Sequence, residues 1–296
     1  MAKKIIPTPA FGLIQQEIKQ SPETRAHLYE GIEKILKMPV VAYFTSFSYP
    51  VMMDETDIQV IEQLFQHMDM KKGCALLLSS PGGDGIAAEN LINLCRTYSG
   101  TGKYITIVPR RAKSAATMVC FGANKIMMGP AAELGPIDPQ VQTPDREIFS
   151  VCNLVESYKD LFGRAVANKD GNIQPYLQQL QRYDERRIKE YEDAIILAKD
   201  IAVKALKSGM MKNMTVAKIE ESIKKFLTPE HTRSHSRAVF ANEAQKCGLA
   251  IDKINRNSEV WHSIYELYMR IDTYVSSTAA KCIETKEQSF VVPVME

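Results

Sequence analysis

The sequence predicts an α/β protein whose core is a mainly parallel sheet covered by helices. Over residues 40–129, short β-branched or continuously apolar runs alternate with amphipathic helical segments, the pattern of successive βαβ units. Residues 175–208 instead carry apolar side chains at spacings of three and four beneath a charged outer face, which predicts a projecting helical arm. The 296-residue length suits one such domain with an arm.

The individual elements follow from their periodicity and their ends. Residues 22–37 predict a helix, and the β-branched and aromatic run over residues 40–46 predicts a strand. Acidic caps and one apolar face predict a helix over residues 54–68, and "CALLLSS" over residues 74–80 predicts a strand buried on both faces. Further helices are expected over residues 86–98, 114–123 and 215–227, strands over 103–109 and 125–129, and a helix, glycine turn and strand over 241–254.

Composition and charge exclude several classes of protein. The formal net charge of +2 is too balanced to indicate a nucleic-acid partner, and no apolar run approaches the roughly 20 residues of a membrane span. Six scattered cysteines without a CxxC pair predict buried, reduced thiols, and no cysteine or histidine pair has convincing zinc spacing. We therefore expect a cytoplasmic protein with no stable membrane anchor, metal or cofactor.

Ser114 and a pair of glycines stand where chemistry collects in parallel sheets, at the carboxyl ends of strands. Ser114 lies among small residues and opens a helix, whose amino end favours developing negative charge. Gly82 and Gly83 follow a strand and leave backbone N–H groups unobstructed. These features fit a nucleophile with an oxyanion hole, which we assign to the N–H groups of Gly83 and Ala115, next to Gly82. The alternative is that Ser114 caps its helix, which local sequence alone favours.

The order of motifs then adds a family resemblance. "LLLSSPGGDGIAAENLINLCR", followed by "AKSAATMVCFGANKIMMGPAAELGPIDPQ" and a distal "EAQKCGLAID", resembles the Clp protease/crotonase-like superfamily. Within it, the chain is most similar to the serine dehydrogenase proteinase family, a branch near signal peptide peptidase A. The resemblance implies a crotonase-like α/β spiral, a serine peptidase acting on a peptide or protein, and a ring or stacked homo-oligomer. It matches Ser114 to the nucleophile and Gly83 to the oxyanion glycine.

The resemblance covers about residues 40–255, and it suggests a division of the chain. We expect an N-terminal helical segment over residues 1–37, the Clp/crotonase-like domain over residues 38–255 with its arm at about 175–208, and a C-terminal extension over residues 256–296.

The general base is not carried over from the Clp proteolytic subunit. Asp138, in the "GPIDPQ" turn, stands where that family has its histidine, and the position of the triad aspartate falls near Ser222. Relatives of signal peptide peptidase A use a lysine instead, and a buried lysine can lose its proton near neutral pH. Lys159, further along the chain beside aromatic and apolar residues, is the preferred match; Lys169 lies in a polar turn.

A histidine provides another candidate base. In "TPEHTRSHSRAVF", His231 and His235 are four residues apart and would share one face of a helix. Imidazole is the usual general base near neutral pH, so His235 is the alternative base or orienting residue.

Two other functions remain compatible with these motifs. One is a catalytically inactive, ring-forming scaffold, and the other is an acyl-thioester enzyme of the crotonase kind. Covalent labelling of Ser114 distinguishes the peptidase from both, and acyl-CoA binding distinguishes these two from each other.

Overall fold

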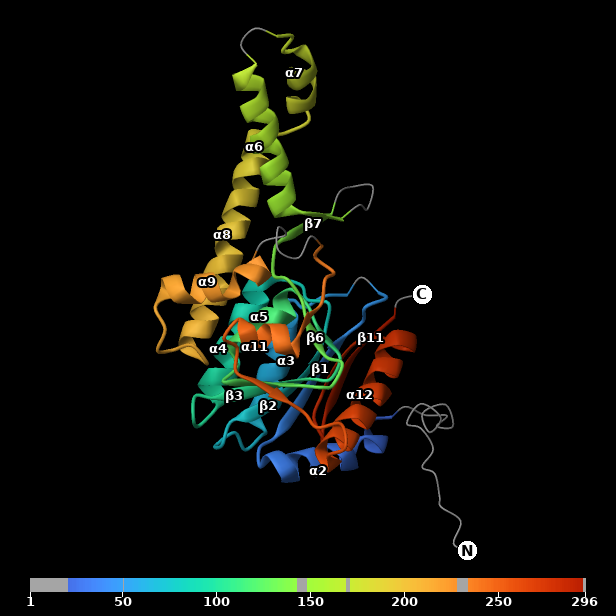
Figure 1. The fold of residues 1–296 in the computed structure, drawn as a ribbon. Coiled ribbons are helices and arrows are strands. Elements are labelled where there is room, and N and C mark those ends of the chain that lie inside the picture. The colour runs from blue at the N-terminus through green and yellow to red at the C-terminus, as the bar shows by residue number, and fades with distance from the viewer. Residues whose placement is uncertain (1–20, 50, 143–147, 169–170, 228–233, 295–296) are drawn as a thin grey trace, which may run out of the picture.

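A computed structural model describes residues 21–49, 51–142, 148–168, 171–227 and 234–294 (Figure 1). Among these residues, a seven-stranded sheet runs in the order β10-β5-β3-β2-β1-β11-β12. Its parallel strands are β1 (Val40–Thr45), β2 (Cys74–Ser79), β3 (Tyr104–Val108), β5 (Lys125–Met128) and β10 (Ile251–Lys253). Two antiparallel strands, β11 (Ala279–Glu284) and β12 (Ser289–Pro293), extend the edge beside β1. The predicted α/β class and the mainly parallel sheet are confirmed.

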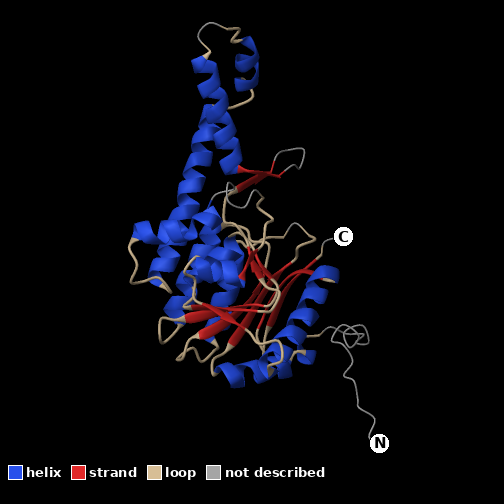
Figure 2. Cartoon of the chain, in the orientation of Figure 1, coloured by secondary structure: helices blue, strands red, loops and turns tan. Residues whose placement is uncertain are grey.

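Helices cover both faces of the sheet, and its central strands are therefore buried on both sides. Every residue of β1 and of β2 is buried, as the continuous apolar run of β2 predicted. A short 3-10 turn (Pro22–Thr24) leads into α2, and α2 (Ala26–Leu36) packs with α12 (Glu259–Ser277) on one face. On the other face lie α3 (Glu55–Gln66), α4 (Gly85–Tyr98) and α5 (Ala115–Gly122). Figure 2 shows this layered arrangement of helices around the strands.

A small second sheet lies near the carboxyl ends of the main strands. It contains β4 (Arg111–Ala112), β6 (Glu133–Leu134) and β9 (Val239–Phe240), in the order β4-β6-β9. A bridge between Ser80 and Ala112 connects β4 to the chain that leaves β2. Three distant parts of the sequence therefore meet at one edge of the molecule.

The helical arm projects from this edge (Figure 1). It contains α6 (Val151–Ala167), α7 (Gln174–Leu180) and α8 (Glu185–Ser208), so the long helix expected over residues 175–208 is divided in two. The division falls where the Asp184 side chain accepts a hydrogen bond from Arg186 N and caps the start of α8. The carboxyl half of α8 buries its apolar face against the main domain, in contact with α5.

Shorter elements complete the described chain. A two-stranded ribbon, β7 (Gln140–Gln142) and β8 (Ile148–Ser150), lies between β6 and the arm. Helix α9 (Val216–Leu227) follows the arm, and α11 (Ala241–Lys246) follows β9.

The six cysteines are unpaired, and five of them are buried. Within the described ranges, no helix has the length and apolar character needed to cross a membrane. In the same ranges, no group of three His, Cys, Asp or Glu side chains is placed to hold a metal ion.

A buried ion pair ties the first helical segment to the C-terminal strands. Arg25 donates from Nε to Glu284 Oε1 at 2.8 Å, and both side chains are fully buried. Tyr29 donates its hydroxyl to the same oxygen at 3.1 Å, so α2 and β11 are joined by one carboxylate. Residues expected as a C-terminal extension thus contribute two strands to the main sheet and a helix to its cover.

We expect Glu284→Gln to destabilise the protein, because it removes the carboxylate that faces the buried Arg25 guanidinium. Breaking one side of a buried ion pair costs about 3–5 kcal/mol, so urea unfolding should show a loss of that order. Glu287→Gln, an exposed carboxylate three residues further on, is the matched control and should change the free energy of unfolding by less than about 0.5 kcal/mol. Equal effects of the two substitutions would contradict this role for Glu284.

Candidate active site

Ser114 adopts an unusual backbone conformation between β4 and α5. Its φ of 48° and ψ of −121° place a non-glycine residue at positive φ, which costs about 1–3 kcal/mol. Its carbonyl accepts hydrogen bonds from Thr117 N and Met118 N, but its side chain makes no capping hydrogen bond. The serine therefore stands at the cap position without using its hydroxyl as a cap. Ser114 is half-buried in a strained strand-to-helix turn, which resembles the turn of a nucleophile elbow.

Gly82 lies against this turn, and only a glycine fits there. A Cβ on Gly82 would lie 2.7 Å from Ser114 Cβ and 2.8 Å from the Lys113 carbonyl oxygen, and the φ of Gly82 is +113°. The Gly82 N–H is already engaged, because it donates to Ser80 Oγ at 3.0 Å. Gly82 thus provides the close approach, while its own N–H is used within the protein.

Gly83 is held from one side by the backbone of Met53. Met53 N donates to Gly82 O at 2.9 Å, and Asp84 N donates to Met53 O at 3.0 Å. In a trans peptide the carbonyl and the following N–H point in opposite directions, so the Gly83 N–H faces away from Met53. In the described parts of the chain, neither Gly83 N nor Ala115 N has a hydrogen-bond acceptor. A Cβ added to Gly82 would lie 3.0 Å from Ala115 N. The N–H groups of Gly83 and Ala115 therefore belong to adjoining segments.

The small sheet gathers further side chains at the same edge. Strands β4 and β6 are parallel, with Ala112 opposite Leu134, and β9 is antiparallel to β6, with Val239 opposite Leu134. Residues after β4, residues after β6 and residues before β9 therefore leave the sheet in the same direction. This topology sends Ser114, Asp138 and His235 to one edge.

Asp138 and His235 form a pair there. His235 Nδ1 lies 2.9 Å from Asp138 Oδ1, and the side chains are 21% and 1% exposed, respectively. The other carboxylate oxygen, Asp138 Oδ2, is buried and has no hydrogen-bond partner among the described residues. A carboxylate on Nδ1 selects the tautomer and the orientation that leave Nε2 available.

Burial around Asp138 also affects a neighbouring thiol. Cys152, near the start of α6, is partly buried, and this burial together with the negative charge of Asp138 raises its pKa to about 11. Cys152 is therefore a neutral thiol near neutral pH. A second negative charge beside Asp138 is disfavoured in this environment.

The lysines expected as bases have different surroundings. Lys159, on α6, is 61% exposed and lies 2.7 Å from Glu192 on α8, within the arm. It lacks the burial that a neutral lysine requires, so the geometry does not favour it as the base. Lys113, which is not one of the expected bases, lies next to the serine and directs its ammonium group to Glu133 at 2.8 Å. Lys169 and His231 lie outside the described residues.

Sequence reasoning gave Asp138 no chemical role beyond marking a missing histidine. The position matching the triad aspartate, near Ser222, is also not used: Ser222 donates its hydroxyl to Lys218 O within α9. The order of residues contained a signal, since the aspartate at the histidine position is followed by a histidine in a distal segment. Only the pairing of β6 with β9 brings the two together.

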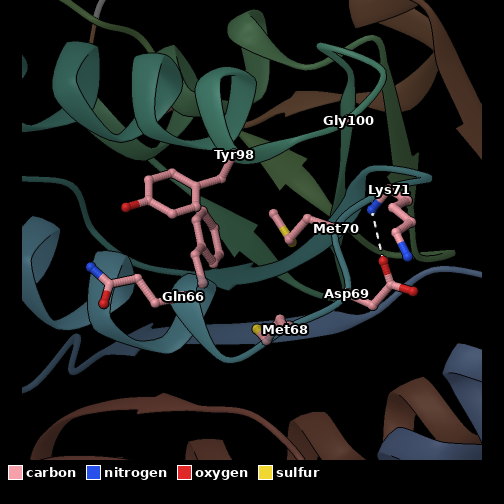
Figure 3. A pocket seen from close by; sticks show the side chains of 8 residues that line it. Gln66, Met68, Asp69, Met70, Lys71, Tyr98 and Gly100 are labelled. Atoms are coloured by element: carbon pink, nitrogen blue, oxygen red, sulfur yellow. Dashed lines mark hydrogen bonds between the residues drawn. The ribbon is translucent and has the colours of Figure 1, made fainter.

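A hollow of about 470 Å³ lies elsewhere, lined by Phe65, Gln66, Met68, Asp69, Met70, Lys71, Tyr98 and Gly100 (Figure 3). Most of these residues precede β2 in the chain, whereas Ser80 and the glycines follow it, so the hollow lies at the opposite edge of the sheet. Two of its polar groups are engaged locally: the Lys71 backbone N–H donates to Asp69 Oδ1, and the Tyr98 hydroxyl donates to Glu62. The hollow carries no constellation for catalysis.

Comparisons with known proteins agree with the motifs. Residues 35–161 match the model of the ClpP-like SDH-type serine proteinase family, which confirms the predicted resemblance. Two uncharacterized proteins of Methanocaldococcus jannaschii are similar. MJ0137 is 26% identical over 200 residues (65% of this chain and 57% of that protein), and MJ1495 is 26% identical over 83 residues (28% and 26%). The match thus spans little more than half of the first relative and about a quarter of the second.

Two solved structures of a 1510-N membrane-bound stomatin-specific protease are distant neighbours. A serine-to-alanine mutant has a TM-score of 0.33 at 14% identity, covering 69% of this chain and 93% of that one. A lysine-to-alanine mutant in complex with a substrate peptide has a TM-score of 0.32 at 15% identity, covering 74% and 94%. TM-scores this low do not establish a common fold.

The family match includes the double glycine, Ser114 and Asp138, and it ends before His235. The segment that contains the strained serine turn, the close glycine approach and the buried aspartate is therefore similar in sequence to the ClpP-like SDH-type serine proteinases.

Proposed function

We propose that the protein is a serine peptidase in which Ser114 is the nucleophile, His235 the general base and Asp138 the residue that orients the base. The observation that carries the proposal is the buried Asp138 carboxylate on His235 Nδ1, at the edge to which the small sheet also sends Ser114. The similarity of residues 35–161 to serine proteinases supports a peptide bond as the target.

The proposed chemistry balances without any further group. Ser114 Oγ attacks the scissile carbonyl carbon while His235 Nε2 accepts its proton. The negative charge that forms on the carbonyl oxygen is stabilised by the N–H groups of Gly83 and Ala115. His235 then returns the proton to the leaving amine, and water hydrolyses the acyl-enzyme through the same base. The buried Asp138 stabilises the imidazolium formed in both halves of the reaction.

The serine and histidine are not yet joined in this structure. No hydrogen bond connects Ser114 Oγ to His235 within the described ranges. Catalytic hydrogen bonds often form fully only when substrate is bound, and we expect this one to form then. An extended peptide would bring its carbonyl between them, adding as a strand beside the unpaired Gly83 N–H.

Some expectations stay predictions. They are the division at residues 38–255, the assembly into a ring or stacked homo-oligomer, and the absence of a cofactor. No specific observation favours the inactive scaffold or the acyl-thioester enzyme over the peptidase.

Covalent trapping tests the nucleophile. A fluorophosphonate should add once to the wild-type chain, on the peptide that contains Ser114, and should not add to Ser114→Ala, as read by intact mass and peptide mapping. Absence of an adduct from the wild type would contradict the peptidase, and acyl-CoA binding would then separate the two remaining functions.

The base is tested by three substitutions in the same assay. His235→Ala should abolish the reaction, and Asp138→Asn should slow it on the order of 10³- to 10⁴-fold because the amide reverses the hydrogen-bond pattern at Nδ1. Lys159→Ala should leave the labelling rate unchanged, since its ammonium group is exposed and paired with Glu192. Loss of labelling in Lys159→Ala with retention in His235→Ala would instead support a serine-lysine dyad.

The close approach at Gly82 gives a third test. A methyl group on Gly82 would collide with Ser114 Cβ, so Gly82→Ala should reduce the labelling rate by on the order of 100-fold or more. Gly85→Ala is the matched control, because its Cβ meets its nearest neighbour at an ordinary 3.6 Å. Equal labelling of both variants would contradict the assigned role of Gly82.

A further inference from the structure

Ser80 lies between three segments: the loop that contains Gly82 and Gly83 (the glycine loop), strand β4 that leads to Ser114 (the serine strand), and the end of β1. It directly follows β2, is fully buried, and is not among the residues proposed to take part in the reaction. Its Oγ accepts the N–H of Gly82 at 3.0 Å and lies 2.7 Å from Thr45 Oγ1. A buried hydroxyl with two partners is held in one orientation.

The backbone of Ser80 is paired with the strand that leads to Ser114. Ser80 N donates to Arg111 O at 3.2 Å, and Lys113 N donates to Ser80 O at 3.0 Å. These two bonds flank Ala112, two residues before the serine, and they fix the position of Ser80 relative to the nucleophile turn.

Ser80 therefore contacts both the segment that carries the proposed nucleophile and the segment that carries the proposed oxyanion glycine. Its backbone is bound to the Ser114 strand, and its side chain is bound to the Gly82 amide. The Gly82 carbonyl is held in turn by Met53 N, so both ends of Gly82 are restrained. Because the next amide along is Gly83 N–H, its direction depends on these two hydrogen bonds.

We propose that Ser80 is a positioning residue for the oxyanion hole, a role that rests on the proposed serine peptidase function. By binding the Gly82 N–H it holds the Gly83 N–H at a fixed place relative to Ser114. Without it, the Gly82 amide is left buried and unpaired, and the φ of a glycine is free enough for the loop to turn toward another acceptor. The Gly83 donor would then miss the developing oxyanion.

If Ser80 only stabilised the fold, its removal would change a different property of the labelling reaction. Loss of stability lowers the fraction of folded chains, and hence the number of serines that a fluorophosphonate can titrate, but it leaves the rate constant of each folded chain intact. Loss of positioning lowers the rate constant at full titration, because the phosphonyl oxygen also requires the oxyanion donors. The amplitude and the rate of labelling separate the two roles.

The test compares Ser80→Ala with Ser79→Ala under a fluorophosphonate probe. Ser79 is the matched control, since it is the preceding residue, is also buried, and takes no part in the hydrogen bonds to Gly82 and Thr45. We expect Ser80→Ala to titrate one serine per chain with a rate constant on the order of 10- to 100-fold lower. Ser79→Ala should match the wild type. The pH at which labelling is half-maximal should not move in Ser80→Ala, because the His235–Asp138 pair is unaltered.

A second variant covers the case in which Ser80→Ala does not fold. Ser80→Cys is nearly isosteric but a weaker acceptor, so its rate constant should fall by a smaller factor at full amplitude. A wild-type rate constant in whichever Ser80 variant folds, or a loss of amplitude alone, would overturn the proposal while leaving the peptidase intact. A wild-type chain that forms no adduct would overturn the proposed function itself.

Discussion

A close backbone contact between Gly82 and the Ser114 turn holds the candidate site together. Their backbones approach so closely that a single methyl group at Gly82 would meet Ser114 Cβ at 2.7 Å. This approach joins the end of β2 to the start of α5, so the Gly83 amide comes beside a strained serine. Such strain persists only where the surroundings over-determine it. Here the surroundings are buried: α5 is buried along its whole length.

Several hydrogen bonds around Gly82 support that contact. Ser80 ties the glycine loop to the serine strand, Met53 closes its other side, and the Met53 segment leads directly into α3. Lys281, from the C-terminal strand β11, contacts Asp54 at 2.9 Å and Asp57 at 2.6 Å, which anchors the start of that helix. Strand β11 is thus connected to the site through the ion pairs of Lys281, a buried charge that is costly unless paired.

Local pattern predicted the elements well where burial follows periodicity. The strands over residues 40–46 and 74–80 and the helix over residues 54–68 lie within a few residues of β1, β2 and α3, because each buries the face its spacing defines. The break between α7 and α8 was missed, since an aspartate cap inside a charged helical pattern resembles any other acidic residue. The antiparallel β11 and β12 were missed as part of the sheet, because pairing partners are set by contacts far away in sequence.

Local spacing and family resemblance were enough to single out Ser114 and the double glycine, each placed after a strand, as the proposed nucleophile and oxyanion groups. The proposed base, in contrast, follows only from the packed fold. Asp138 and His235 are separated by the whole arm, and they meet because β6 pairs with β9 in one register. Lys159 satisfied a spacing expectation but lies exposed on α6. The physical reason is that protonation chemistry depends on burial and on neighbouring charge, which are properties of the packed fold and not of the local sequence.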